Sequence, residues 1–153
     1  MDDGGTTWIV VADGGVARIF AERRRAGDLV EDSARRMTST DSDRPQAPSH
    51  RATVHQRVGG GRHAAKGPSL QDEAEGRFLK RVAVALTQAE ASDAFDHLVI
   101  LAPPRALGQL RQSLASGVAR RLQASGPHDC VRETPERIRQ RLRDLRAETW
   151  KAS

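Results

Sequence analysis

FDHLVILAPPRALGQLR, residues 95–111, is the clearest structural signal in this chain of 153 residues. It contains an unbroken apolar run at residues 98–102, then two prolines, then leucines at helical spacing. A short apolar run bounded by breakers is typical of a strand that is buried on both faces. We therefore expect this strand at the centre of a sheet, followed by a helix that starts near Pro104, whose fixed φ suits a first helical turn.

Arg105 follows directly after these prolines. In open α/β sheets, ligands tend to lie where strands end and helices begin, so Arg105 is a candidate binding residue. The alternative is an ordinary surface arginine after a tight turn.

The first 37 residues predict a three-stranded antiparallel meander. Residues 6–12 are rich in β-branched side chains, and residues 16–22 alternate between two faces, as expected of a hairpin. The turn of this hairpin consists of Asp13, Gly14 and Gly15. We expect the Asp13 side chain to stabilise the turn by hydrogen bonds to the backbone of the turn itself. The weaker and more polar residues 29–37 are predicted to form an edge strand.

Three helices are expected in the second half of the chain. Ser69 and Asp72 predict a capping box at the start of a helix that extends to about residue 91. The helix after Pro104 is expected to break near residues 116–117, to resume through Leu122 and to end at residues 125–127. Residues 128–133 are predicted to form a short strand, and a last helix begins at residues 134–135.

This order of elements, β-β-β-α-β-α-β-α, predicts a single α/β domain over residues 1–153. We expect a mixed five-stranded sheet of ribonuclease H-like architecture with helices on both faces. Topology alone does not define a chemistry.

Residues 38–68 differ from the rest because Ser, Pro and Gly are abundant and apolar periodicity is absent. We expect a long flexible loop there. Its candidate binding residues are Gly59, Gly60, Gly61, Arg62, His63 and Lys66. The spacing of these glycines matches neither a Walker loop nor a dinucleotide fingerprint. The alternative is a mobile glycine linker.

Composition permits an anionic partner. The net charge is +5, and residues 77–153 hold 14 Lys and Arg against 8 Asp and Glu, a surplus of six. The last helix carries Arg137, Arg139, Arg141, Arg143 and Arg146, which we interpret as a solvated face or, alternatively, as a surface for an acidic or RNA partner. The absence of a leader, of a membrane-length apolar run and of a second cysteine predicts a cytoplasmic protein.

We expect no enzymatic activity, no metal and no cofactor. A metal-dependent nuclease needs several converging carboxylates, and only Asp13 and the pair Glu73 and Glu75 are candidates. There is no G-x-S-x-G elbow, and Cys130 has no identifiable base.

Several segments together resemble one known family; they are WIVVAD (8–13), ARIF (17–20), GGGRHA (59–64), EGRF (75–78), FDHLVILAPPR (95–105) and LGQLR (107–111). They are similar to the bacterial host-attachment protein family, whose members are described as required for attachment to host cells. That family looks like the middle domain of archaeal and eukaryotic class I peptide-release factors, in which a Gly-Gly-Gln loop precedes a long helix. The resemblance implies that Gly59, Gly60 and Gly61 match this loop, with Arg62 in place of the glutamine.

Two hypotheses follow for the function. The first is a non-enzymatic module that binds RNA or the ribosome through the glycine-rich basic loop, without peptidyl-tRNA hydrolysis. The second is a protein–protein interaction module that supports bacterial attachment to host cells. The sequence leaves the oligomeric state open.

Overall fold

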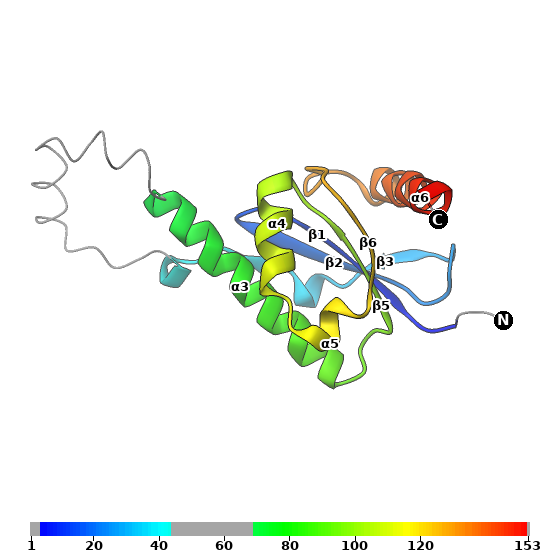
Figure 1. The fold of residues 1–153 in the computed structure, drawn as a ribbon, viewed down its shortest axis with the longest axis horizontal. Helices are drawn as coiled ribbons and strands as arrows, with labels where there is room; N and C mark the ends of the chain where they lie inside the picture. The colour runs from blue at the N-terminus through cyan, green and yellow to red at the C-terminus, as the bar shows by residue number, and fades with distance from the viewer. Residues whose placement is uncertain (1–3, 44–68, 153) are drawn as a thin grey trace, which may run out of the picture.

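The computed structural model describes residues 4–43 and 69–152 (Figure 1). Its strands are β1 (Thr7–Ala12), β2 (Val16–Glu22), β3 (Leu29–Glu31), β4 (Met37–Thr38), β5 (His97–Leu101) and β6 (Leu122–Gly126). Its helices are α3 (Leu70–Ala91), α4 (Pro104–Ser113), α5 (Ser116–Ala119) and α6 (Pro135–Ala152), with short 3-10 turns η1 (Ser33–Arg35) and η2 (Asp41–Asp43).

The strands form one mixed sheet in the order β3-β2-β1-β5-β6, with β4 also pairing with β2. β2 runs antiparallel to β1 and β3, whereas β5 is parallel to both β1 and β6. This is the strand order of a ribonuclease H-like sheet, so the predicted fold class is confirmed. β5 is internal and buried as expected, although β1 is the middle strand.

The expected third strand is divided in two, so the sheet has six strands where five were predicted. Residues 32–36 leave the sheet because Asp32 closes a local turn, accepting hydrogen bonds from Arg35 through both its side chain and its backbone carbonyl, each at 3.1 Å. The Arg35 guanidinium then lies 4.8 Å from the centre of the Trp8 ring and covers it.

The last strand was predicted at the wrong place. Residues 122–126 form β6 instead of continuing a helix, and residues 128–133 form no strand. β6 pairs in parallel with β5, where Gly126 lies opposite Leu101. The following loop is held by Arg18, whose Nη1 donates to the carbonyls of Val131 (2.9 Å) and Glu133 (2.8 Å). Hydrogen bonds from the Arg18 side chain therefore hold residues 128–133, where we expected the backbone hydrogen bonds of a strand in the sheet.

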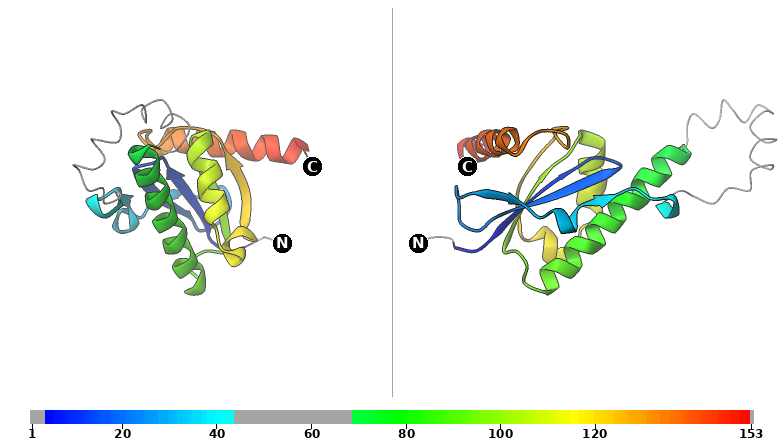
Figure 2. Two further views of the ribbon diagram at one scale, coloured as in Figure 1. Left: turned by 60° about the vertical axis from the view of Figure 1, so that its left-hand side comes forward. Right: turned by 180° about the vertical axis from the view of Figure 1, so that it is seen from behind.

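Helices cover both faces of the sheet, as predicted (Figure 2). On one face, Val10, Leu98 and Ile100 pack in a cluster with α3, α4 and α5. On the other face, the buried side chains of β1 and β5 pack against α6; they are Ile9, Val11, Val99 and Leu101, with Ile138, Leu142 and Leu145 of the helix. The alternation of side chains along β1 and β5 explains why a continuous apolar run serves two cores.

The predicted capping box of α3 is present. Ser69 Oγ accepts from the Asp72 backbone N–H at 3.0 Å, and Asp72 Oδ2 accepts from the Ser69 N–H at 3.2 Å. A cap of this kind contributes about 1 kcal/mol to helix stability.

Glu22, at the end of β2, is a fully buried carboxylate with 0% exposure. It accepts from Arg139 Nη1 at 2.6 Å, from Arg146 at 2.7 and 3.0 Å, and from the Ala26 N–H at 3.1 Å. Burial alone raises the pKa of Glu22, but the hydrogen bonds from Arg146 and Arg139 outweigh it and lower the pKa below its ordinary value. The arginine-rich face of α6 is therefore not wholly solvated.

No helix in the described ranges combines the length and the apolar character that crossing a bilayer requires.

Replacing Glu22 by Ala should lower the free energy of unfolding by roughly 3–5 kcal/mol, because two guanidiniums would be left buried without their carboxylate. Urea denaturation measures this difference. Glu148→Ala, which removes an exposed acid from α6, should change stability by less than about 0.5 kcal/mol. Equal effects of the two substitutions would show that the Glu22 cluster does not hold α6.

Candidate functional site

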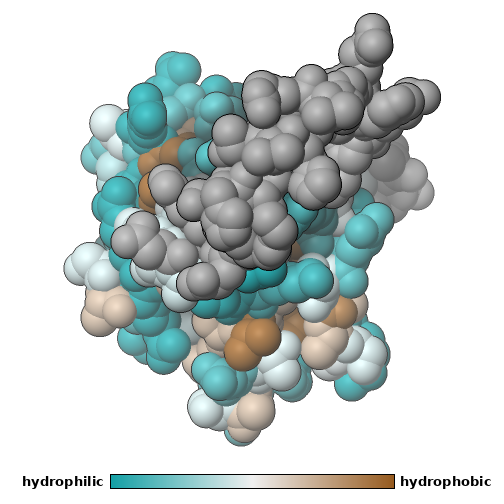
Figure 3. Space-filling model, turned by 90° about the vertical axis from the view of Figure 1, so that its left-hand side faces the viewer, coloured by the Kyte–Doolittle hydropathy of each residue, from teal (hydrophilic) through white to brown (hydrophobic). Residues whose placement is uncertain are grey.

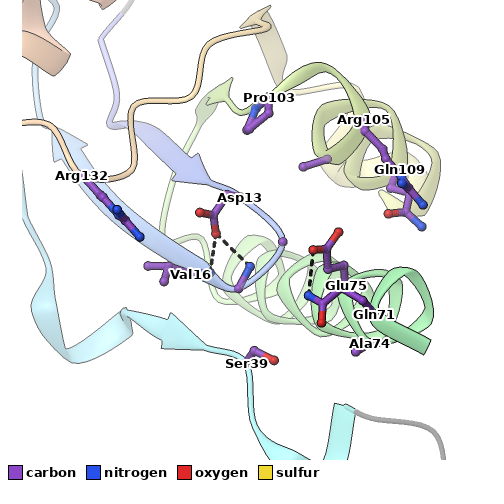
Figure 4. A pocket seen from close by; sticks show the side chains of 13 residues that line it. Asp13, Val16, Ser39, Gln71, Ala74, Glu75, Pro103, Arg105, Gln109 and Arg132 are labelled. Atoms are coloured by element: carbon purple, nitrogen blue, oxygen red, sulfur yellow. Dashed lines mark hydrogen bonds between the residues drawn. The ribbon is translucent and has the colours of Figure 1, made fainter. Parts of the chain in front are cut away.

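The carboxyl ends of β1 and β5 border a crevice. From β1 the chain turns back to β2 on one side, whereas from β5 it continues through α4 to β6 on the other side. Neighbouring parallel strands that connect in opposite directions form a topological switch point, where open α/β sheets tend to bind ligands. A cavity of about 510 Å³ lies at this place (Figure 4). We call it the switch-point crevice.

Four parts of the chain line the switch-point crevice. They are the β1–β2 turn, the first turns of α3, the start of α4, and a set of two single residues, one directly after β4 and one in the loop before α6. The polar members are Asp13, Ser39, Gln71, Glu75, Arg105, Gln109 and Arg132. This lining offers both hydrogen-bond donors and acceptors, with two acids and two arginines.

Asp13 holds the β1–β2 turn, as predicted. Its Oδ1 accepts from the backbone N–H groups of Gly15 and Val16, both at 2.8 Å (Figure 4). The tip of this turn touches α3, because a Cβ at Gly14 would lie 2.6 Å from the Cγ and Cδ atoms of Glu75. Gln71 Nε2 in turn donates to Glu75 at 3.0 Å. Glycine at position 14 thus lets the hairpin pack closely against α3.

Arg105 is the predicted binding residue that the structure describes, and it lies in the switch-point crevice. Its side chain is 63% exposed and pairs with Asp72 at 3.0 Å. The Arg105 hydrogen bond lowers the pKa of Asp72. The guanidinium therefore links the start of α4 to the capping box of α3. Arg132, in contrast, is exposed and forms no ion pair with any described residue.

The other predicted binding residues, Gly59, Gly60, Gly61, Arg62, His63 and Lys66, lie outside the described residues. The structure does describe the two positions that flank residues 44–68, Asp43 and Ser69, and both are anchored. Arg81 donates to both oxygens of Asp43 at 2.7 Å, and the capping box holds Ser69. Ser39 and Gln71, which lie near these anchors in sequence, line the switch-point crevice.

Asp43 is almost fully buried, with 2% exposure. The hydrogen bonds from Arg81 lower the pKa of Asp43 to about 2, although burial acts in the opposite direction.

Within residues 4–43 and 69–152, no group of three or more His, Cys, Asp and Glu side chains could hold a metal ion. Asp13 and Glu75 share the switch-point crevice, but Glu73 is not part of its lining. Burial raises the pKa of the Cys130 thiol to about 11, so this cysteine is protonated at neutral pH.

Sequence reasoning missed Arg132 and Glu75 as crevice residues. Arg132 was assigned to a strand, and Glu75 was considered only as a metal ligand. Ligands tend to bind at the carboxyl ends of strands in open α/β sheets, and this rule applies to β1 as well as to β5. Applied to β1, it would have indicated that the residue packed against Gly14, which is Glu75, lies at the candidate site.

The strand order and the crevice at its switch point define a ribonuclease H-like α/β domain. A family model described as "Protein required for attachment to host cells" matches residues 8–142, so the chain belongs to this host-attachment family. The predicted family is thereby confirmed. No curated protein matches the chain.

Among solved structures, the chain is similar to the archaeal translation termination factor aRF1, at 9% sequence identity and a TM-score of 0.43. The match covers 94% of this chain and 39% of that factor, so the chain spans well under half of its length.

Gly14→Ala should destabilise the protein by about 1 kcal/mol, because its new Cβ overlaps Glu75. The same change in a Glu75→Ala background should cost almost nothing, giving a coupling of about 1 kcal/mol in a double-mutant cycle measured by urea denaturation. Gly15→Ala is the matched control, since a Cβ there meets other atoms only at 3.9 Å or beyond. A cost that persists without Glu75 would contradict this contact.

Asp43→Asn should cost about 2 kcal/mol at pH 7, since the folded state lowers the pKa of Asp43 from 3.8 to about 2. A lowered pKa contributes stability above the unfolded value of 3.8, and that contribution disappears as pH falls towards 2. The difference in unfolding free energy between wild type and variant should therefore shrink between pH 4 and pH 2. A difference independent of pH would exclude the ion pair as its cause.

Proposed function

We propose that this host-attachment family protein is a non-enzymatic module that binds RNA or a ribonucleoprotein such as the ribosome, and that it acts in the cytoplasm. The observation that carries the proposal is the division of its arginines into two groups. Of the 18 arginines in the described ranges, eight form ion pairs with acids. The other ten are exposed and form no ion pair there; they are Arg23, Arg24, Arg25, Arg36, Arg77, Arg111, Arg120, Arg132, Arg137 and Arg143.

Exposed guanidiniums without an acid partner remain available to phosphates where they lie next to the bound polyanion. Arginine presents a planar fork of N–H donors that matches phosphate oxygens, and neutralising phosphates releases counterions into solution. The surplus of six positive charges in residues 77–153, 14 against 8, falls entirely on residues that the structure describes. This favours a polyanionic partner.

The described surface is poor in apolar docking area. The large apolar side chains exposed on it are Val30, Leu70 and Val84, which lie on β3 and at separate turns of α3. In Figure 3 the described atoms of the visible face are mostly hydrophilic, with small hydrophobic spots. A stable protein interface usually contains a contiguous apolar core, so this surface fits a polar partner better.

A non-enzymatic role is supported by what the crevice acids do. Asp13 holds the hairpin turn, and Glu75 packs on that turn and accepts from Gln71. Cys130 is buried and protonated at neutral pH. The carboxylates of Asp13 and Glu75 and the thiol of Cys130 therefore have structural roles, which supports a non-enzymatic function.

In this proposal the contact face is the end of the molecule that carries the switch-point crevice. Arg105 and Arg132 line that end, and the anchored residues Asp43 and Ser69 connect to the segment that holds Gly59 to Gly61, Arg62, His63 and Lys66. Glycines permit close backbone approach to a ligand, and the basic side chains would contact phosphates.

The family description, attachment to host cells, favours a second candidate function, a protein-interaction module that supports attachment. Copurification from lysate, with and without nuclease, separates the two. Recovery of ribosomal material that is lost on nuclease treatment supports RNA binding, and recovery of one envelope protein alone supports the second function.

The affinity for single-stranded RNA, measured by fluorescence anisotropy, should fall steeply between 50 and 200 mM salt. Arg62→Ala with Lys66→Ala should reduce the slope of log affinity against log salt by about 1.4, at about 0.7 per phosphate contact. Arg111→Ala with Arg120→Ala removes the same charge from exposed positions elsewhere and should leave the slope nearly unchanged. Undetectable or salt-independent binding would refute the proposal.

A further inference from the structure

A second concave surface lies between the β2–β3 turn and α6. One cavity of about 380 Å³ is lined by Gly27 and Asp28 of the turn and by Arg139 and Arg143 of α6, among others. A second cavity lies on the other side of the same turn. It shares Ala26, Gly27 and Asp28, and it is lined in addition by Arg23, Arg24 and Val30 rather than by α6. We call the two together the turn–helix cavity. β2 begins at the switch-point crevice and ends at Glu22, next to this turn, so the two places lie at opposite ends of the strand.

The walls of the turn–helix cavity are fixed by hydrogen bonds. Glu22 accepts from the Ala26 N–H at 3.1 Å, and Arg139 Nη2 donates to the Gly27 carbonyl. The Gly27 N–H donates to the Arg24 carbonyl at 2.8 Å. Ala26 has a φ of 64°, a left-handed conformation that these contacts hold in place. The arginines are therefore presented from a preorganised turn.

The cluster beneath the cavity carries an unbalanced charge. Glu22 supplies one carboxylate, whereas Arg139 and Arg146 supply two guanidiniums whose side chains are only 14% and 15% exposed. A partly buried net positive charge is costly unless an anion lies nearby. Among the described residues, acceptors occupy two of the five N–H groups of Arg139, so the guanidinium can donate further hydrogen bonds.

The acids around the cavity do not cancel this charge. Five arginines face three carboxylates, which leaves a net charge of +2; the arginines are Arg23, Arg24, Arg139, Arg143 and Arg146, and the acids are Glu22, Asp28 and Glu136. Arg143 donates to Gln140 at 3.1 Å and, like Arg23 and Arg24, forms no ion pair among the described residues.

We propose that the turn–helix cavity is a phosphate-binding site for the backbone of single-stranded RNA. A phosphate placed between Arg139 and Arg143 neutralises the surplus charge of the Glu22 cluster, and Arg23 and Arg24 bind the next phosphate along the strand. The basic groups of the cavity are all arginines, whose fork geometry suits phosphodiesters. This inference rests on the proposed function, because it adds a second place, at the opposite end of β2 from the switch-point crevice, where the backbone of that RNA is bound.

The test compares two double variants with equal loss of charge. Arg24→Ala with Arg143→Ala empties the turn–helix cavity of two free guanidiniums without touching the Glu22 cluster. Arg111→Ala with Arg120→Ala is the control. By anisotropy with a single-stranded RNA, the first pair should weaken binding about tenfold near 0.1 M salt and lower the salt slope by about 1.4, whereas the control should change both little.

Equal losses in the two double variants would overturn the site and leave RNA binding itself in place, as a diffuse charge effect. A wild-type protein that binds no RNA would refute the proposed function. Vesicles containing anionic phospholipid form a further arm of the test. Binding to these vesicles that depends on Arg24 and Arg143, without binding to RNA, would assign the cavity to a membrane surface and overturn the inference.

Discussion

The buried carboxylate of Glu22 is the constraint on which the arrangement of α6 and the β2–β3 turn depends. Hydrophobic contact of Ile138, Leu142 and Leu145 with the sheet supplies most of the attraction, but that attraction has no direction. The two guanidiniums from α6 must reach one point at the end of β2, and this fixes the rotation and position of the helix. The same carboxylate ties down the turn through the Ala26 N–H. One acid thus joins a strand, a turn and a helix.

The sequence predicted well those elements whose signals are local. β5 followed from its apolar run, α3 from its capping box, and the β1–β2 hairpin from its β-branched strands and the turn at Asp13 and two glycines. β6 could not be found in this way, because its sequence LQASG lacks β-branched residues and becomes a strand only through pairing with β5. The interruption between β3 and β4 depends on a local turn at Asp32 and on the packing of Arg35 over Trp8.

The candidate site was predictable only in part. The strand-end rule located Arg105, but Glu75 and Arg132 belong to segments that reach the crevice through tertiary packing. The arginines of α6 show the same limit. Arg139, Arg143 and Arg146 look alike in sequence, yet Arg139 and Arg146 are bound to an acid more than 110 positions away while Arg143 remains without an ion pair. The Gly59–61 segment lies outside the described residues, so its role stays a prediction.

The presence of exposed arginines at two separated places has a consequence for how a polyanion would be held. The switch-point crevice and the turn–helix cavity lie at the two ends of β2, whose seven residues span roughly 20 Å. A strand that engaged both would gain affinity because the second contact becomes intramolecular once the first is made. Such linked contacts are individually weak and strongly dependent on salt. They require spacing that matches the rigid sheet, and this rigidity rests on the two packed cores and the Glu22 cluster. The arginines that form ion pairs set the geometry in which the arginines without ion pairs are presented, and in the proposed function both groups would contribute to holding the polyanion.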